Sequence, residues 1–480
     1  MARTIPQKAP PSLPFFGFSG PSGPMIFLML GLALAALLSF PTGAPAVSGA
    51  GDDAAGRVHN LTLADVIRMG RESSPQLWVQ KHVIEQAEAQ LGQARAGRLP
   101  RLEYLQITGL VPEARGDATF SPDDRSCLLD GLGPFTRIEI TLSQPLYTFG
   151  RLKAHIEAAQ LGLEAEEASH DRFERELVSS LKELYYTIQL NEEIHRIVSK
   201  TKEGLVEAVE KAEALLEEDE LTQQDLQKLR YGLARAGGQL LEIEKGRRLV
   251  HAALLRMLYL PEGEDFRLAE KRLRPIAFEL EDLDTYRKIA RRERPDWEQL
   301  DVGISAKEAE LRAERKEYYP DLFLAGLFRY ATAPNRDEQD NPFVSEEFNF
   351  LEGGVYLGCR LALDFGLPQR IAEKRAELDA LLQKRKDANS GMLLEVEKAY
   401  REVEEKQERL VFTRESRKNG RALVALSTAN FHLGLGEAED VFESFRIYTE
   451  AAAEYYMTVK DYNMAVAELA RAAGVVSLEQ

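Results

Sequence analysis

The feature that most constrains this chain is a stretch of roughly 67 residues without proline, from Arg151 to about Glu217. Its apolar residues recur every three or four positions, which is typical of a helix with one packed face. At 1.5 Å per residue, a helix of this length would span about 100 Å, more than the width of a globular domain. We therefore expect a coiled-coil-like helix that breaks near 218–222, followed by a second helix to about Leu260.

The residues just before this helix predict a strand. In IEITLSQPLYTFGR, 138–151, apolar and polar residues alternate and then give way to a charged, Ala-rich segment, and VYLGCRLALDFG, 355–366, makes the same change. The strand-to-helix junctions of the two stretches contain Pro145, Phe149, Gly150, Phe365 and Gly366. Proline lacks a backbone donor and glycine tolerates unusual dihedral angles, so Pro145 and Gly150 would permit the chain to bend there.

The chain repeats itself at an offset of about 220 residues. Leucines and prolines of the first half have counterparts in the second: Leu63, Pro75, Leu91 and Pro100 match Leu283, Pro295, Leu311 and Pro320. We interpret residues 60–262 and 280–475 as two copies of one unit, joined by a linker at 263–279.

Each copy is expected to contain two strands and a long helical hairpin. The predicted strands lie near 101–111 and 135–146 in the first copy, and near 320–330 and 352–364 in the second. The second long helix is expected at about 369–430 and its partner at 438–473. The expected fold class is therefore mainly α with some β.

Composition separates the first 46 residues from the rest. Residues 25–40 are apolar and Ala44-Pro45-Ala46 suits cleavage, so 1–46 is expected to be a signal peptide, with an uncleaved anchor as the alternative. Beyond residue 46 no apolar run is long enough for a transmembrane helix. The net charge of −17 argues against nucleic acid as a partner. The two cysteines make no disulfide framework, and no Cys/His cluster indicates a metal site.

The predicted strands have the length of membrane-crossing strands. Each has about ten residues, with one apolar face and one polar face. Four strands cannot close a barrel, and open edges in hydrocarbon would leave backbone groups unsatisfied. Three chains would supply twelve strands and an interior wide enough for water. The alternative is a soluble domain in which the strands are edge hairpins and the helices form an ordinary stalk.

Several motifs, in the same order in both copies, resemble those of one family. LPRLEYLQITG and YPDLFLAG resemble its entry into the first strand of each repeat, and LSQPLYTFGR and LALDFG resemble its strand-to-helix junctions. Residues 429–474 resemble its second helical hairpin. Over about 60–475 the chain resembles the TolC-like outer-membrane efflux proteins. The resemblance implies a homotrimer, with a twelve-stranded barrel in the outer membrane and an α-barrel of long helices in the periplasm.

The resemblance also assigns residues near the break between the long helices, where the family has its periplasmic mouth. Asp440 and Glu443 match acidic positions that line the channel entrance and would favour cations; ordinary charge at a helix N-terminus is the alternative. Leu433, Gly434, Leu435 and Gly436 match the turn that contacts an adaptor protein; a plain helix C-cap is the alternative. Phe431 and Gly436 stand where some members carry the Tyr and Arg that close the mouth, so that type of gate is not expected.

The remaining site residues belong to the polar faces of the strands. Arg137, Glu139, Arg360 and Asp364 are expected to face water inside the barrel. No catalytic motif is present, so we expect no enzyme, cofactor or metal.

The expected function is a passive exit duct that works with a periplasmic adaptor and an inner-membrane pump in efflux or secretion. A component of type I protein secretion is one alternative, and a non-pore coiled-coil scaffold of the cell envelope is an alternative of another class. The sequence does not identify the cargo.

Overall fold

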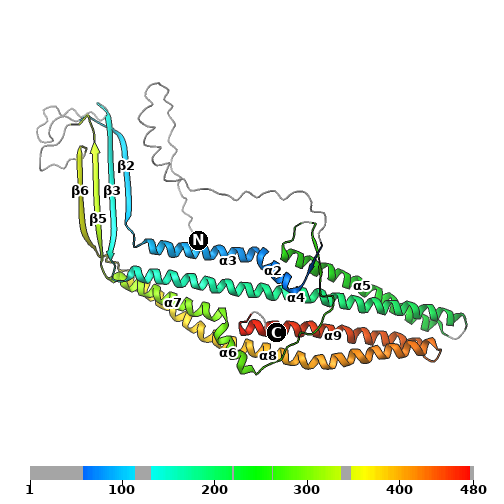
Figure 1. Cartoon of the computed structure of the whole chain (residues 1–480). Helices are drawn as coiled ribbons and strands as arrows, with labels where there is room; N and C mark the ends of the chain where they lie inside the picture. The colour runs from blue at the N-terminus through cyan, green and yellow to red at the C-terminus, as the bar shows by residue number, and fades with distance from the viewer. Residues whose placement is uncertain (1–57, 114–130, 219–220, 262, 337–347, 476–480) are drawn as a thin grey trace, which may run out of the picture. The chain divides into compact units, whose positions relative to one another are not determined.

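The computed structural model describes residues 58–113, 131–218, 221–261, 263–336 and 348–475 (Figure 1). These residues belong to one unit, which spans Ala55–Gln480. The expected signal peptide and Cys127 lie outside them. Within the described ranges, none of the helices combines the length and the apolar character that a membrane span requires.

Four long helices form two hairpins. The first hairpin is α4, Arg151–Glu217, with α5, Gln223–Leu258, and the second is α8, Leu367–His432, with α9, Ala438–Ala473. The side-chain oxygen of Thr222 caps α5 by accepting from the backbone N–H of Asp225 at 3.2 Å. Pro368 lies in the first turn of α8, where its missing N–H breaks no helical bond.

Shorter elements precede each hairpin. They are β1, Val58–Leu61; α2, Leu63–Ser73; α3, Pro75–Ala96; β4, Asp265–Leu268; α6, Leu283–Glu293; α7, Pro295–Arg315; and the 3₁₀ turn η1, Lys316–Tyr318. The region expected to be only a linker, 263–279, therefore contains strand β4, which pairs in parallel with β1. The order of helix, helix, strand, strand, long helix, helix occurs twice along the chain.

A four-stranded antiparallel sheet lies next to the N-terminal ends of α4 and α8. Its strands are β2, Arg101–Val111; β3, Gly133–Tyr147; β5, Asp321–Thr332; and β6, Phe350–Arg360, in the order β2-β3-β5-β6. Strand β6 ends at Arg360, before the predicted end at 364. The reason is that the partner strand β5 begins at Asp321, opposite Arg360, so pairing with β5 stops there. Farther on, the Asp364 carboxylate accepts from the backbone N–H of Gly366 at 2.7 Å, just before α8.

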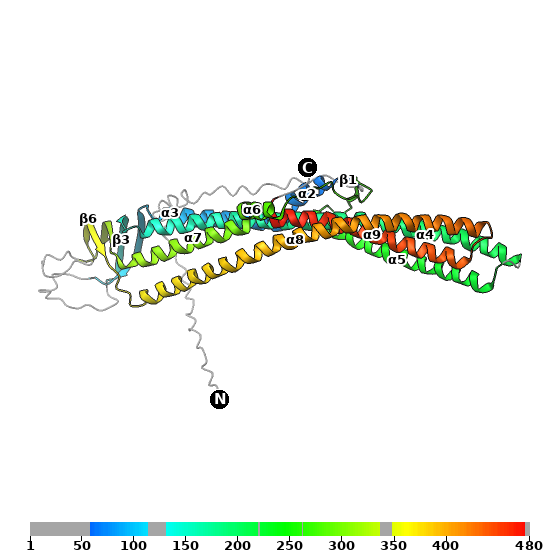
Figure 2. The same cartoon turned by 90° about the horizontal axis from the view of Figure 1, so that it is seen from below.

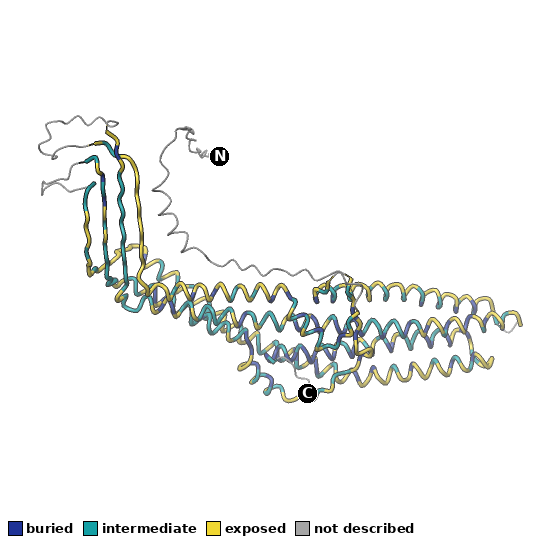
Figure 3. Tube along the Cα trace, turned by 45° about the horizontal axis from the view of Figure 1, so that its top comes forward, coloured by how far each residue is buried: buried dark blue, intermediate teal, exposed yellow. Residues whose placement is uncertain are grey.

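The pairing register divides the sheet into two chemically different faces. Opposite residues share a face, so one face collects apolar side chains: Leu102, Ile138, Ile140, Leu142, Leu324, Phe328, Val355 and Leu357. The other face carries a row in which Glu139 lies opposite Arg329, and Arg329 lies opposite Glu352. Both faces are mostly exposed or half-buried along the strands (Figure 3).

The core of the described unit lies among the long helices. One cluster joins all four of them with the short elements, through residues such as Leu181, Leu254, Val396 and Val459. A second cluster lies nearer the hairpin turns and joins the same helices through Leu205, Leu229, Phe431 and Val441. Helices α4 and α9 pack against each other in the middle, while α5 and α8 form the flanks (Figure 1). Helices α5 and α9 both start at the end of the bundle that lies away from the sheet (Figure 2).

Candidate functional site

The turn between α8 and α9 is a helix C-cap that exposes two leucines. Gly434 adopts φ +72°, and the N–H of Leu435 donates to the carbonyl of Asn430 at 2.9 Å, while that of Gly434 donates to Phe431 at 3.1 Å. This is the Schellman arrangement, which favours glycine at the left-handed position. The side chains of Leu433 and Leu435 are 71% and 77% exposed. A β-carbon on Gly436 would lie 3.0 Å from that of Asn430, so the turn is also tight there.

The two acidic residues expected at a channel entrance have different surroundings. Asp440 is exposed and makes no ion pair within the described ranges. Glu443 is bound by Arg446, and this hydrogen bond holds the pKa of Glu443 below its ordinary value. Arg446 also binds Glu450 at 3.0 Å. Of the two positions, only Asp440 therefore presents an uncompensated negative charge.

A polar link between the two hairpins lies close to these acids. Lys228 of α5 donates to the Glu439 carboxylate of α9 at 2.5 Å and lies 3.6 Å from Asp225. The hydrogen bond to Glu439 raises the pKa of Lys228. The rings of Tyr231 and Phe442 meet edge to face beside it, with centroids 6.3 Å apart. Lys228 and Glu439 are 211 positions apart, so no local sequence pattern could predict this link.

Phe431 belongs to the core of the helical bundle. Only 1% of its surface is exposed, and it packs in the cluster that joins the four long helices near the turns. A buried phenylalanine offers no polar group to a neighbouring chain. That a gate of the Tyr and Arg type is not expected here stays a prediction.

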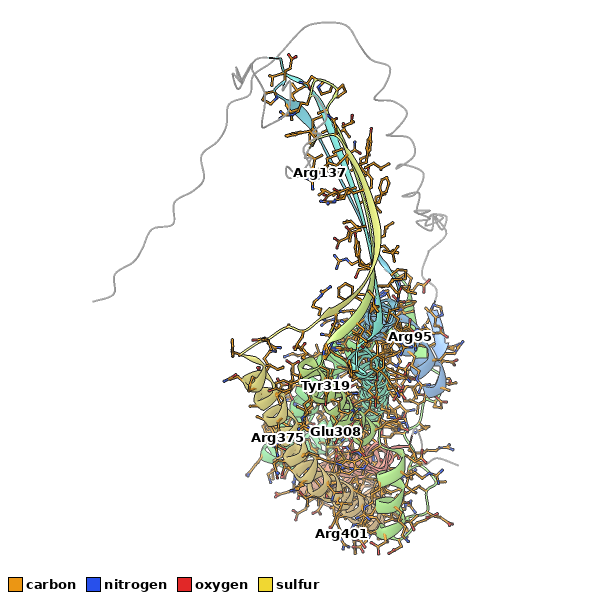
Figure 4. All side chains as sticks on the ribbon, turned by 90° about the vertical axis from the view of Figure 1, so that its left-hand side faces the viewer. Arg95, Arg137, Glu308, Tyr319, Arg375 and Arg401 are labelled. Carbon is orange, nitrogen blue, oxygen red and sulfur yellow. The ribbon has the colours of Figure 1, made fainter. Side chains whose placement is uncertain are left out.

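The two strand-to-helix junctions are built differently. Gly150 caps α4 with φ +82°, and the preceding Phe149 also has a positive φ of 50°. The Phe149 ring stacks on Tyr319 at a centroid distance of 5.4 Å, which holds this unusual turn against η1. Gly366 has an ordinary φ of −81°, and Phe365 beside it is 92% exposed. Figure 4 shows Tyr319 where the sheet meets the helices.

Charged side chains tie the sheet to the helices at these junctions. Arg370 of α8 binds Glu314 at 2.5 Å and also binds Glu317 and Asp364. Arg151 of α4 binds Asp321 at the start of β5. The expectation that Asp364 belongs to the polar face of the strand is thus wrong. It lies beyond the end of β6, where bonding to Arg370 lowers its pKa.

The other three residues expected in a barrel's water lie on the polar face of the sheet. Arg137 binds Glu139 on the same strand, β3. Arg329 of β5 binds Glu352 of β6, and neither Arg329 nor Glu352 was predicted from the sequence. Arg360 ends β6 with its guanidinium 4.9 Å from the centre of the Phe323 ring. Arg137 lies well along the sheet, away from the helices (Figure 4). The alternation of polar and apolar residues in β3 and β6 identified this face from the sequence. Placing Arg329 on it required the pairing register of β5.

One set of side chains in the described ranges lies close enough together to hold a metal ion: His170, Asp171 and Glu174 on α4. Arg71 already binds Glu174 at 2.8 Å. This set is only half-buried, and arginine already engages one of its carboxylates, so it gives no reason to infer a metal centre.

The geometry at Gly150 leads to a prediction with a matched control. Gly150→Ala should lower the free energy of unfolding by about 1–2 kcal/mol, because alanine disfavours the left-handed conformation. Its β-carbon would also lie 2.5 Å from the Lys316 ammonium nitrogen. Gly366→Ala, at an ordinary φ, should change stability by less than about 0.5 kcal/mol. Thermal unfolding of both variants in detergent tests this, and equal losses would contradict it.

Comparisons with known proteins address the fold directly. The sequence model of the family described as outer membrane efflux protein matches residues 66–257. Over these residues the resemblance to the outer membrane efflux proteins is confirmed. No curated protein matches the chain.

Solved structures of outer-membrane channels share the efflux-protein fold over most of this chain. The channel OprN is 15% identical, with 90% of this chain and 97% of that chain covered and a TM-score of 0.69. VceC from Vibrio cholerae is 17% identical, with 87% and 97% covered and a TM-score of 0.70. MtrE from Neisseria gonorrhoeae is 16% identical, with 87% and 90% covered and a TM-score of 0.69. OprN and MtrE are outer-membrane channels and VceC is an outer membrane protein. Together with the match to the family model, this agrees with the expectation that the chain is not an enzyme.

Proposed function

We propose that this chain is the outer-membrane exit duct of a tripartite efflux or secretion system and reaches from the outer membrane into the periplasm. Three copies would join their sheets into one twelve-stranded barrel and their long helices into one tunnel. The observation that carries the proposal is the sheet, which leaves an apolar face and both edges uncovered in the described part of the chain.

The apolar face of the sheet fits a lipid environment. Val355 and Leu357 of β6 are each 75% exposed, and Leu102 of β2 is 65% exposed. A continuous apolar face of this kind is unfavourable in water and marks a surface that meets lipid or protein. Hydrocarbon would cover it, provided that the strand edges are paired.

The strand edges fit one another. Strands β2 and β6 each have a neighbour on one side only, and they run in opposite directions because every pairing in the sheet is antiparallel. The free edge of β6 could therefore pair with β2 of a second copy and continue the sheet. Closing three sheets in this way removes every free edge, and the charged face with Arg137, Glu139 and Arg360 would then line the water-filled interior.

The helical end of the duct would form its mouth. Asp440 of each copy would place one uncompensated carboxylate at the opening, and the exposed turn at Leu433–Gly436 would contact a periplasmic adaptor. The corresponding turn of the first hairpin, LLEEDELT at 215–222, has no glycine, so the two turns would offer different contacts. The internal duplication remains part of this proposal, and the twofold order of elements supports it.

Planar-bilayer recording tests the proposed function. The detergent-extracted full chain should give discrete conductance steps and migrate as a heat-modifiable oligomer. A coiled-coil scaffold would give no conductance at any protein concentration, and that result would contradict the proposal. The gene neighbourhood would separate efflux from type I secretion, because the cargo is selected by the pump.

The link between Lys228 and Glu439 leads to a prediction about opening of the mouth. Lys228→Glu should place three like charges together with Asp225 and Glu439, and separate the two hairpins at the mouth. Since an exposed ion pair shifts an equilibrium by roughly two- to fivefold, the open fraction in bilayer recordings should rise by about that factor. Adding Glu439→Lys should reverse the effect. If the double variant is as open as the single one, the ion pair between Lys228 and Glu439 does not hold the mouth closed.

A further inference from the structure

Residues 333–336 form a turn just beyond the end of β5, on the side of the sheet away from the helices (Figure 1). The N–H of Arg336 donates to the carbonyl of Ala333 at 2.9 Å. The side-chain amide of Asn349 binds both ends of the turn. Its oxygen accepts from the N–H of Ala333 at 2.7 Å, and its nitrogen donates to the carbonyl of Arg336 at 2.9 Å. These three hydrogen bonds fix the shape of the turn.

The turn reaches across the sheet to the hairpin of β2 and β3. The amide nitrogen of Asn335 donates to the carbonyls of Val111 at 3.1 Å and Gly131 at 2.8 Å. The Arg336 guanidinium donates to the carbonyl of Pro112 at 2.9 Å. Strand β3 lies between β5 and β2 in the sheet, so the turn must cross the end of β3 to make these bonds.

Two observations place the turn on the polar face of the sheet. Gly133 belongs to the same face of β3 as Arg137, and a β-carbon added to Gly133 would collide with Cγ of Asn335. Phe135 belongs to that face as well, and its ring meets the ring of Phe348 edge to face, with centroids 5.5 Å apart. The turn and Phe348 therefore lie over the face that carries the charged row.

The polar face is covered where the turn crosses it. Ala331, at the end of β5, is 2% exposed, and Ala333 is 0% exposed. On the same face of β5, the residues between 321 and 329 are only half-buried. The Arg336 guanidinium lies 3.9 Å from the centre of the Phe348 ring. The turn and this ring thus form one packed layer, and the alanines at 331 and 333 allow the layer to lie close to the strands.

In a closed barrel this layer would stand inside the lumen. Twelve strands about 4.8 Å apart and tilted by about 40° make a barrel with a radius of roughly 12 Å. A chain segment packed on the face of a sheet lies up to about 10 Å from it. Three such layers, one from each copy, would therefore take up a large part of the cross-section at the outer exit.

We propose that the turn at 333–336, together with Phe348, narrows the outer exit of the duct and limits what passes there. The inference rests on the proposed function, because the polar face becomes the wall of a lumen only in a closed barrel. It goes beyond that function, in which the periplasmic mouth is the narrow place. Cargo that has entered at the mouth would still have to pass this layer.

An engineered disulfide tests the constriction in the full chain. In a background with Cys127→Ser and Cys359→Ser, Gly133→Cys is combined with Asn335→Cys. The collision at Asn335 Cγ, where a cysteine has its sulfur, brings the two side chains within reach of a disulfide. The disulfide holds the turn across the exit. Reduction frees it, because the two hydrogen bonds of the Asn335 amide are absent from this variant.

Reduction should raise the single-channel conductance in planar bilayers by at least about twofold, since conductance grows with the open cross-section. A second variant tests the same point without a disulfide. Asn335→Ala with Asn349→Ala removes the side chains that shape the turn and tie it to β2. This variant should raise the conductance by a similar factor. Its heat-modifiable migration should remain that of the parent, because the pairing of the four strands is unchanged.

The matched control places a disulfide on the opposite face of β3 and β5. Thr136 and Thr332 lie directly opposite each other near the same end of the sheet, on the face of Ile138. Forming or reducing a disulfide between Thr136→Cys and Thr332→Cys should leave the conductance unchanged.

The outcomes separate the constriction from the duct itself. Unchanged conductance on reduction of a formed disulfide at 133 and 335, or in the double alanine variant, would overturn the constriction and leave the duct standing. An equal change in the threonine-position control would also overturn it. A parent protein that gives no conductance would contradict the proposed function.

Discussion

Leu357→Arg should largely remove the protein from the outer membrane. Leu357 is 75% exposed in β6, on the face where the register collects apolar side chains. An arginine on the lipid face of a membrane barrel costs about 2–4 kcal/mol near the middle of the bilayer. In a trimer this free-energy cost would arise three times, once for each copy. Membrane fractionation and heat-modifiable migration measure the loss.

Tyr356→Arg is the control, because this neighbouring residue points to the other face of the same strand. That face already carries Glu352 and Arg360 and would meet water inside the barrel. Tyr356→Arg should leave the amount of assembled protein within about twofold of the parent. If both substitutions reduce the amount of assembled protein equally, or if neither reduces it, one face does not meet lipid while the other meets water.

Asp440→Lys should convert a cation-preferring opening into one that prefers anions. Asp440 is exposed and unpaired within the described ranges, so a ring of three copies would change from three negative to three positive charges. Charged rings in narrow openings select ions by sign, because the wall concentrates the counter-ion. The cation-to-anion permeability ratio should fall by roughly tenfold. The reversal potential in a salt gradient across a planar bilayer measures it.

Glu443→Gln provides the comparison. The charge of Glu443 is already balanced by Arg446, which also binds Glu450, so its removal should change the reversal potential much less than Asp440→Lys. A larger effect from Glu443→Gln would show that the unpaired carboxylate is not the one that sets selectivity. An unchanged ratio in Asp440→Lys would remove Asp440 from the lining.

The sequence could indicate the long helices and the sheet because their signals are local. Steps of three and four residues from Arg151 onward, and the alternation in β3, recur often enough to define an element. Strand β4 was missed because it has four residues and is defined by its pairing with β1. The end of β6 was misplaced because the apolar alternation continues past Arg360, whereas the partner strand β5 begins opposite that residue, at Asp321.

The channel entrance at Asp440 and Glu443 stays a prediction, and the resemblance behind it did not distinguish the surroundings of the two residues. The resemblance pointed to Asp440 and Glu443 together, but which of them is neutralised depends on Arg446 one helical turn away. The link between Lys228 and Glu439, and the network around Arg370, join segments that are distant in sequence. Only the packing of one hairpin against the other brings such groups together.

The mass of the detergent-extracted particle tests the central claim most directly: several copies must join to close a sheet that one copy leaves open. Native mass spectrometry of the full-length, processed protein should give three chains per particle, and removal of detergent should precipitate it. A single chain that stays folded and dispersed without detergent would contradict the account.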